Sequence, residues 1–345
     1  MVKNFVKNVL GVSVYRYGYQ AIILLSSYVT ARLLTPEEYG TVALITVITG
    51  FINAFNDSGI SLLVIRTDYG DRFYKMLYNL SVLMGFILSG IVVVLALPIA
   101  IFNNNEKLIV PTLISAGIIL IQTLSVVPLA VLRKRELFIT RAKIDFWAFS
   151  TSTLVTIVLA YFGFSFWSLI FSQLYAALFQ LIWSNSIVKV NLWQYSLKKS
   201  LISYKMSKKT LLNLSSGTVF TYWSANTGNF VIGKFFGEAL LGIYNRANSL
   251  SSMVVNLIGG VLNSILLPTL KSVEKSKDFL LFITTISSVV LAVCAGINVV
   301  IVLYGPEIIT FIWSKTWVSV SDYLPYLLFT SYSYVSVIFS MNLYY

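Results

Sequence analysis

Three ionisable side chains lie inside apolar stretches that are long enough to be membrane helices: Arg16, Asp57 and Arg246. Charges in hydrocarbon are costly, so such residues are candidates for ligand binding or for pairing with one another. Arg16 and Asp57 fall at comparable depth on consecutive stretches. Arg16 could attract an anionic ligand that Asp57 tunes or releases; alternatively, the two form a structural ion pair, or Arg16 extends to the nearer interface.

Arg246 lies about two helical turns inside its apolar stretch. A guanidinium that faces a central cavity could hold a phosphate group through paired hydrogen bonds. The alternatives are that Arg246 extends toward the opposite interface or caps a neighbouring helix. The sequence alone leaves these readings open.

Asparagines recur at helical spacing in the same part of the chain. Asn226 and Asn229 share one helix face, and Asn256 and Asn263 lie nearly on one stripe. Asparagine can bond sugar hydroxyls as donor and acceptor, but it also joins neighbouring helices in membrane proteins. The predicted ligand-binding set is Arg16, Asp57, Asn226, Asn229, Arg246 and Asn256.

The residue types that most often carry covalent or metal chemistry are scarce. The chain has no His and a single cysteine, Cys294. It can therefore form neither an intrachain disulfide nor a cluster of thiolate ligands, and histidine-based metal sites are excluded. We expect no cofactor, no metal and no enzymatic activity.

The composition indicates that these residues are positioned by membrane helices. The chain is 57% hydrophobic and 11% charged, with a mean hydropathy of +0.81, whereas soluble proteins carry about 25% charged residues. The fold class predicted is an all-α polytopic membrane protein. Its ten predicted spans, each able to cross about 30 Å of hydrocarbon, are 10–34, 40–65, 77–102, 110–132, 144–163, 166–188, 210–235, 241–267, 279–304 and 323–345.

The basic residues outside these spans divide unequally between the two sides of the membrane, 19 against 4. The poorer side has Arg32, Lys107, Lys234 and Lys315; the richer side has Lys3, Lys7, Arg66, Arg72, Lys75, Arg133, Lys134, Arg135, Arg141, Lys143, Lys189, Lys198, Lys199, Lys205, Lys208, Lys209, Lys271, Lys275 and Lys277. This asymmetry predicts a multi-pass protein whose N-terminus faces the cytoplasm. It also explains the net charge of +12 through contact with membrane lipids, without a nucleic-acid partner.

The second half of the chain repeats the pattern of the first. With a shift of 202 residues, Ala31–Gly40 (ARLLTPEEYG) aligns with Gly233–Gly242 (GKFFGEALLG). We therefore predict a six-helix bundle over 1–188, a cytoplasmic amphipathic linker over 189–209 and a partial, four-helix bundle over 210–345. The second bundle is incomplete in this interpretation, as in a C-terminally truncated chain.

The same segments carry a family likeness. Ala31–Gly40, followed by Asp57–Gly59 (DSG), resembles the opening of polysaccharide-biosynthesis exporters of the Wzx type. Gly233–Gly242, followed by Ile243–Leu250 (IYNRANSL), resembles the start of their second half. The resemblance implies a MATE-like two-bundle architecture and a flippase for undecaprenyl-pyrophosphate-linked oligosaccharide. Possible partners are the polysaccharide polymerase and the chain-length machinery.

Two other functions are weighed against this expectation. A MATE-type cation-coupled antiporter usually has acidic groups in its central spans, where this chain has Asp57 alone. A membrane glycosyltransferase or polysaccharide polymerase would place catalytic acids, Arg or His on a large outer loop. The longest predicted outer loop, Gly305–Asp322, offers no recognisable acid/base pair. The three in-span charges sum to +1, which favours an anionic substrate.

Overall fold

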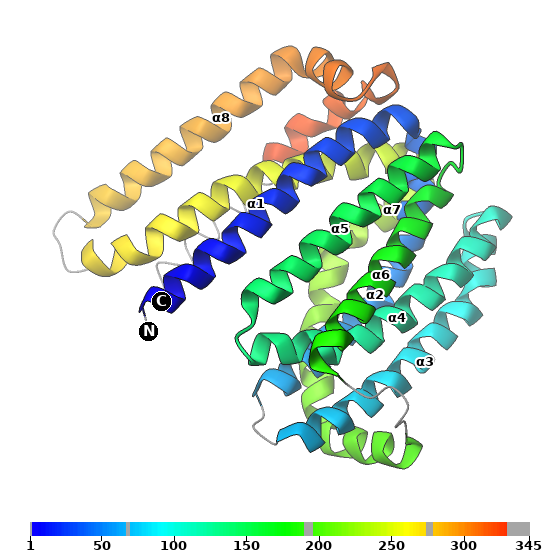
Figure 1. Ribbon diagram of the computed structural model, residues 1–345. Coiled ribbons are helices and arrows are strands. Elements are labelled where there is room, and N and C mark those ends of the chain that lie inside the picture. Colours follow the sequence, from blue (N-terminus) through cyan, green and yellow to red (C-terminus); the bar gives the residue numbers. More distant parts are fainter. Residues whose placement is uncertain (1, 67–69, 190–195, 274–278, 330–345) are drawn as a thin grey trace. The chain divides into compact units, whose positions relative to one another are not determined.

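The computed structural model describes residues 2–66, 70–189, 196–273 and 279–329, and within them every regular element is a helix. Their order along the chain is shown in Figure 1. The helices are α1 (Val2–Leu33), α2 (Pro36–Arg66), α3 (Gly70–Phe102), η1 (Glu106–Leu108), α4 (Ile109–Lys134), α5 (Phe138–Tyr161), α6 (Trp167–Val188), α7 (Leu197–Val273), α8 (Phe279–Ile312) and η2 (Lys315–Trp317).

Within the described part of the chain, five stretches of helix are long and apolar enough to cross a membrane: Pro36–Ile65, Phe73–Phe102, Glu106–Lys134, Phe138–Tyr161 and Leu291–Ile312. They agree with the predicted all-α membrane fold. Helices also cover the predicted spans 10–34, 166–188, 210–235 and 241–267, whereas most of 323–345 lies outside the described residues. The count of ten spans therefore stays a prediction.

The turn between α1 and α2 follows from its local sequence. The Thr35 amide donates to Glu38 Oε2 at 2.6 Å, and the Glu38 amide donates back to Thr35 Oγ1 at 3.4 Å. This reciprocal pair is a capping box, and Pro36 occupies the first helical position, where no amide hydrogen is needed. The sequence Thr-Pro-Glu-Glu thus ends one helix and starts the next.

A second break lies within α7, at Gly237. Its φ of 84° belongs to the left-handed region that favours glycine, and it separates α7 into two arms. Gly237 is the position that the shift of 202 residues aligns with Thr35. The local break therefore falls where the internal repeat predicts a turn.

Among the described residues, several helices begin before the predicted spans, as α5 and α7 illustrate. Helix α5 begins at Phe138 rather than at 144, so Arg141 lies on the helix and not in a loop. Helix α7 begins at Leu197, inside the predicted linker, and Figure 1 shows its first turns running across one end of the α2–α6 helices. Whether this segment lies on a membrane surface stays a prediction.

The chain forms two compact units, Met1–Glu238 and Ala239–Tyr345. The first arm of α7 belongs to the first unit, where the Tyr222 hydroxyl donates to the Val47 carbonyl oxygen of α2 at 2.6 Å. The domain limits predicted above, 1–188, 189–209 and 210–345, stay a prediction.

The core of the first unit lies between α2, α3 and α4. Its fully buried residues include Val64, Leu77, Leu80, Val127 and Val131. Lipid tails are as apolar as these side chains, so the hydrophobic effect does not drive helices together inside a membrane. Close packing of side chains holds α2, α3 and α4 together instead. Beside α2 and α4 the packing is incomplete, and a cavity remains there.

Helix α1 runs along α5 in the same unit through aromatic contacts. The Tyr15 and Phe146 rings lie 5.7 Å apart and the Tyr19 and Phe149 rings 4.3 Å apart, measured between ring centroids. In the second unit, a smaller core contains Cys294, Leu324 and Leu328.

Candidate functional site

A cavity of about 640 Å³ lies within the first unit, between α2, α4, α5, α6 and the first arm of α7. Along α2 it extends from Gly50 to Ile65, a rise of about 22 Å at 1.5 Å per residue. Ile65 lies at the end of α2 that the charge asymmetry assigns to the cytoplasm. The cavity therefore reaches from the middle of the helices to their basic end.

The deep end of the cavity carries neutral hydrogen-bonding groups. Asn53 Nδ2 on α2 donates to Gln122 Oε1 on α4 at 2.5 Å, and both residues line the wall with Tyr222. An amide side chain has donor and acceptor capacity beyond one such bond. This part of the wall can thus bond a ligand rich in hydroxyl groups.

The other end is basic, because Arg133 from the last turn of α4 and Arg141 from the first turn of α5 line it. Arg141 Nε donates to Asp145 Oδ2 at 2.8 Å, and Gln180 Nε2 on α6 donates to the other carboxylate oxygen at 3.3 Å. Asp145 thereby fixes the direction of both side chains. The guanidinium groups can attract an anion from the cytoplasmic side.

A second cavity of about 440 Å³ lies between α1, α5 and α6. Tyr15, Tyr19, Phe146 and Phe149 form much of its wall, with Arg16 and Asp145 among the lining residues. Gln180 lines both cavities.

Two carboxylates hold the opposite, predicted outer end of the first unit together. Glu38 accepts a hydrogen bond from the Ser165 hydroxyl in the α5–α6 turn. Glu238, beside the break in α7, accepts from Thr41 Oγ1 on α2 and from Asn105 Nδ2 in the α3–α4 loop, each at 2.5 Å. These bonds connect segments from all parts of the first unit.

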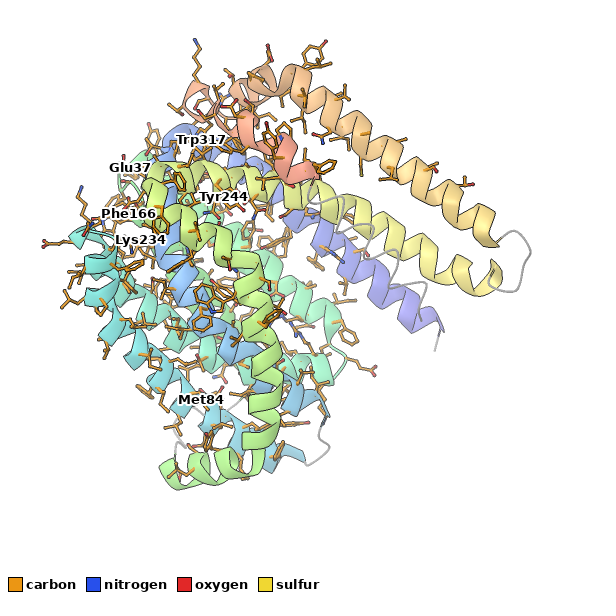
Figure 2. All side chains as sticks on the ribbon, turned by 180° about the vertical axis from the view of Figure 1, so that it is seen from behind. Glu37, Met84, Phe166, Lys234, Tyr244 and Trp317 are labelled. Carbon is orange, nitrogen blue, oxygen red and sulfur yellow. The ribbon has the colours of Figure 1, made fainter. Side chains whose placement is uncertain are left out.

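The aromatic and basic residues of this end lie around the same bonds. Lys234 Nζ lies 4.0 Å from the centroid of the Phe102 ring and donates to the Phe102 carbonyl oxygen. Figure 2 shows Glu37, Phe166 and Lys234 together at this end of the first unit. Side-chain hydrogen bonds thus join neighbouring segments at this end.

Of the predicted ligand-binding residues in the first unit whose side chains are described, none lines the larger cavity. Arg16 is exposed and lines the second cavity together with Asp145. The side chains of Asp57 and Asn256 lie outside the described residues, so the predicted Arg16–Asp57 pair stays a prediction.

Asn226 and Asn229 bond within their own helix. Asn226 Nδ2 donates to the Tyr222 carbonyl oxygen at 2.9 Å, and Asn229 Nδ2 donates to Asn226 Oδ1 at 3.3 Å. Neither residue is among those that line the larger cavity. Their geometry favours the structural role over sugar binding, and their role in binding stays a prediction.

Arg246 lies in the second unit against two tryptophans. Its guanidinium carbon is 5.3 Å from the Trp313 ring centroid and 5.5 Å from that of Trp317, and both rings are almost fully buried. Stacking of this kind is a cation–π interaction. It favours the reading in which Arg246 packs on neighbouring helices, while a role in ligand binding stays a prediction.

Several polar residues that line the two cavities are absent from the predicted set, among them Gln122, Arg133, Arg141, Asp145 and Gln180. The two glutamines could have been found as polar residues within apolar spans, by the argument applied to asparagine. Asp145 stood at the edge of the predicted span 144–163, and the earlier start of α5 places it about two turns inside the helix.

The helices and the cavities together define a polytopic α-helical membrane protein with an open cavity whose lining includes amide side chains and, at one end, two arginines. Residues 29–322 match the model of the family described as polysaccharide biosynthesis protein, and the chain belongs to that family. The match confirms the resemblance to Wzx-type exporters and associates the chain with polysaccharide biosynthesis. No curated protein matches the chain.

Proposed function

We propose that the protein is a flippase that moves undecaprenyl-pyrophosphate-linked oligosaccharide from the inner to the outer leaflet of the bacterial cytoplasmic membrane. The observation that carries this proposal is the larger cavity, whose wall is neutral and amide-rich in the middle of the helices and basic at one end. The family match supports it. Transport of this kind needs no covalent step.

The chemistry of the wall fits the two parts of such a ligand. The pyrophosphate is an anion, and the positive charges of Arg133 and Arg141 at the basic end can attract it. The oligosaccharide presents hydroxyl groups, to which the Asn53–Gln122 pair can donate and from which it can accept. The basic end then receives the ligand from the cytoplasm, where lipid-linked oligosaccharides are assembled.

The charge of the larger cavity argues against the MATE-type cation antiporter. Among its described lining residues, the charged side chains are the two arginines, and no carboxylate is among them. The nearest described carboxylate bonded to the wall, Asp145, accepts from Arg141 and Gln180. A cation would meet repulsion here, whereas an anion would be attracted.

The outer end offers little to a membrane glycosyltransferase or polymerase. Among the described carboxylates of this end, Glu38 accepts a hydrogen bond from a turn side chain, and Glu238 accepts one from a loop side chain and one from α2. A general acid or base needs a free approach to the reacting group. We therefore place the function in transport, with the polymerase and the chain-length machinery as proposed partners downstream and the N-terminus in the cytoplasm.

The proposal is tested with the full chain in lipid vesicles. The substrate is an undecaprenyl-pyrophosphate-linked oligosaccharide tagged on its terminal sugar with nitrobenzoxadiazole, which external dithionite reduces. In protein-free vesicles only the outer-leaflet population is reduced, and we expect the chain to make the inner-leaflet population accessible as well.

The Arg133→Ala/Arg141→Ala variant should flip this substrate about tenfold more slowly, as for loss of a charge-assisted bond of about 1.5–3 kcal/mol. Lys107→Ala is the matched control, because Lys107 is exposed at the opposite end. Accessibility no greater than in protein-free vesicles would contradict the proposed function. If the double variant and the control flip the substrate at equal rates, Arg133 and Arg141 do not take part in transport.

A further inference from the structure

The second cavity differs from the larger one because four aromatic rings line it. The rings of Tyr15, Tyr19, Phe146 and Phe149 line it, with small residues such as Ala176 between them. By residue position, the parts of α1, α5 and α6 that form it belong to their cytoplasmic halves. This is an aromatic, mainly apolar groove at the depth of the inner leaflet.

The two cavities meet at one group of hydrogen-bonded side chains. Gln180 lines both of them and donates to Asp145, which lines the groove. Asp145 in turn accepts from Arg141, which lines the larger cavity. A ligand with one polar and one apolar part can therefore place its junction at Gln180 and Arg141 and extend into both spaces.

We propose that the groove between α1, α5 and α6 binds the first isoprene units of a polyprenyl phosphate while the phosphate lies at Arg141 and Gln180. This inference rests on the proposed function, and it adds a site for the lipid tail. A space of about 440 Å³ holds a few isoprene units at the packing density of protein interiors. Arg16 lines the same groove and adds positive charge to its wall.

The form of the groove favours a branched isoprenoid over a straight acyl chain. Its wall combines rings with small residues, since Ala142 and Ala148 line it from the same helix as Phe146 and Phe149. Methyl branches fit between rings where the wall is small, whereas an unbranched chain leaves those spaces empty. Binding of any lipid tail is the competing outcome that the experiment must separate.

The test is photochemical labelling of the full chain in vesicles of phosphatidylethanolamine and phosphatidylglycerol. The probe is undecaprenyl monophosphate with a diazirine on its second isoprene unit, and the comparison probe is phosphatidic acid with a diazirine in one acyl chain. Mass spectrometry locates the adducts. We expect the prenyl probe to label the segments around Tyr15, Phe146 and Ala176, and the acyl probe to label them more weakly.

Ala176→Trp fills the groove and should reduce these prenyl adducts about tenfold, since overpacking a fitted site excludes its ligand. Ile182→Trp is the control, because Ile182 lies on the same helix with its side chain 68% exposed. Ala142→Trp fills the groove from α5 and provides a second variant if Ala176→Trp does not accumulate.

Prenyl adducts confined to other segments, or equal labelling of the groove by both probes, would overturn the proposal. Unchanged labelling in a folded groove-filling variant would do the same. The flippase assay separates this result from the proposed function. If the chain transports the tagged oligosaccharide but the prenyl adducts lie in other segments, only the proposed groove is rejected. If the groove carries prenyl-specific adducts but the chain does not transport the oligosaccharide, only the proposed flippase function is rejected.

Discussion

Asp145 is the residue on which the geometry of both cavities depends. It accepts from Arg141 and Gln180, so it orients the basic end of the larger cavity and borders the groove. The Arg141 side chain is 19% exposed and that of Asp145 is 38% exposed. The pair is therefore intermediate between a surface and a buried ion pair, and its contribution to stability should be intermediate as well.

We expect Arg141→Gln and Asp145→Asn each to lower the stability of the detergent-solubilised protein, by about 1–2 kcal/mol, because each leaves one charge in an apolar helical bundle. The double variant removes both charges and should recover part of that loss. Thermal unfolding followed by loss of monodisperse protein measures the effect.

Glu106→Gln provides the control for removing one carboxylate, since Glu106 is exposed in η1. It should leave the unfolding midpoint unchanged. Strictly additive effects of Arg141→Gln and Asp145→Asn would show that the two side chains do not interact in the membrane protein.

At the scale of elements, the close approach of α2 to the break in α7 has a clear steric requirement. A Cβ atom on Gly40 would overlap the backbone carbonyl group of Glu238. Backbone cannot move aside as the end of a flexible side chain can. Because Gly40 has no Cβ atom, α2 can approach the break in α7 closely enough for Thr41 to donate a hydrogen bond to Glu238.

Gly40→Ala should destabilise the first unit by about 1–3 kcal/mol, the usual range for overpacking, and should separate α2 from Glu238. Gly90→Ala is the matched control, because Gly90 is also within a helix but has no atom within 4 Å of the added Cβ. It should be neutral or stabilising by about 0.5–1 kcal/mol. Unfolding midpoints in detergent provide the comparison, and a Gly40→Ala variant as stable as Gly90→Ala would contradict the packing seen here.

At the scale of the whole molecule, the charge asymmetry predicts which ends of the helices face the cytoplasm. Single cysteines in a Cys294→Ala background provide the test, with an impermeant thiol reagent added to intact cells. Positions 37, 104 and 307 should be labelled from outside, since Glu37, Asn104 and Glu307 are exposed on the predicted outer side. Positions 136 and 198 should be labelled only after the cells are opened, and outside labelling of either would reverse the topology.

The sequence by itself determined the features that depend on local order and on composition. The all-α membrane class follows from hydropathy, the turn at Thr35–Glu38 from a capping box, and the family from short signatures around Ala31–Gly40. The break at Gly237 was placed by the internal repeat. Each of these features depends on residues that are close together in the chain. Helix geometry and the preference of side chains for lipid or water are therefore enough to predict it.

Only the tertiary structure decided which polar residues meet. Asn53 and Gln122 are 69 positions apart, and Asn105 and Glu238 are 133 apart. Helical spacing tells which residues share a face, but it does not tell which neighbouring helix that face contacts. For this reason the sequence left open whether Arg246 faces a cavity or contacts a neighbouring helix, and it passed over Asp145 at the junction of the two cavities. The structure adds the stacking of Arg246 on Trp313, and a role of Arg246 in ligand binding stays a prediction.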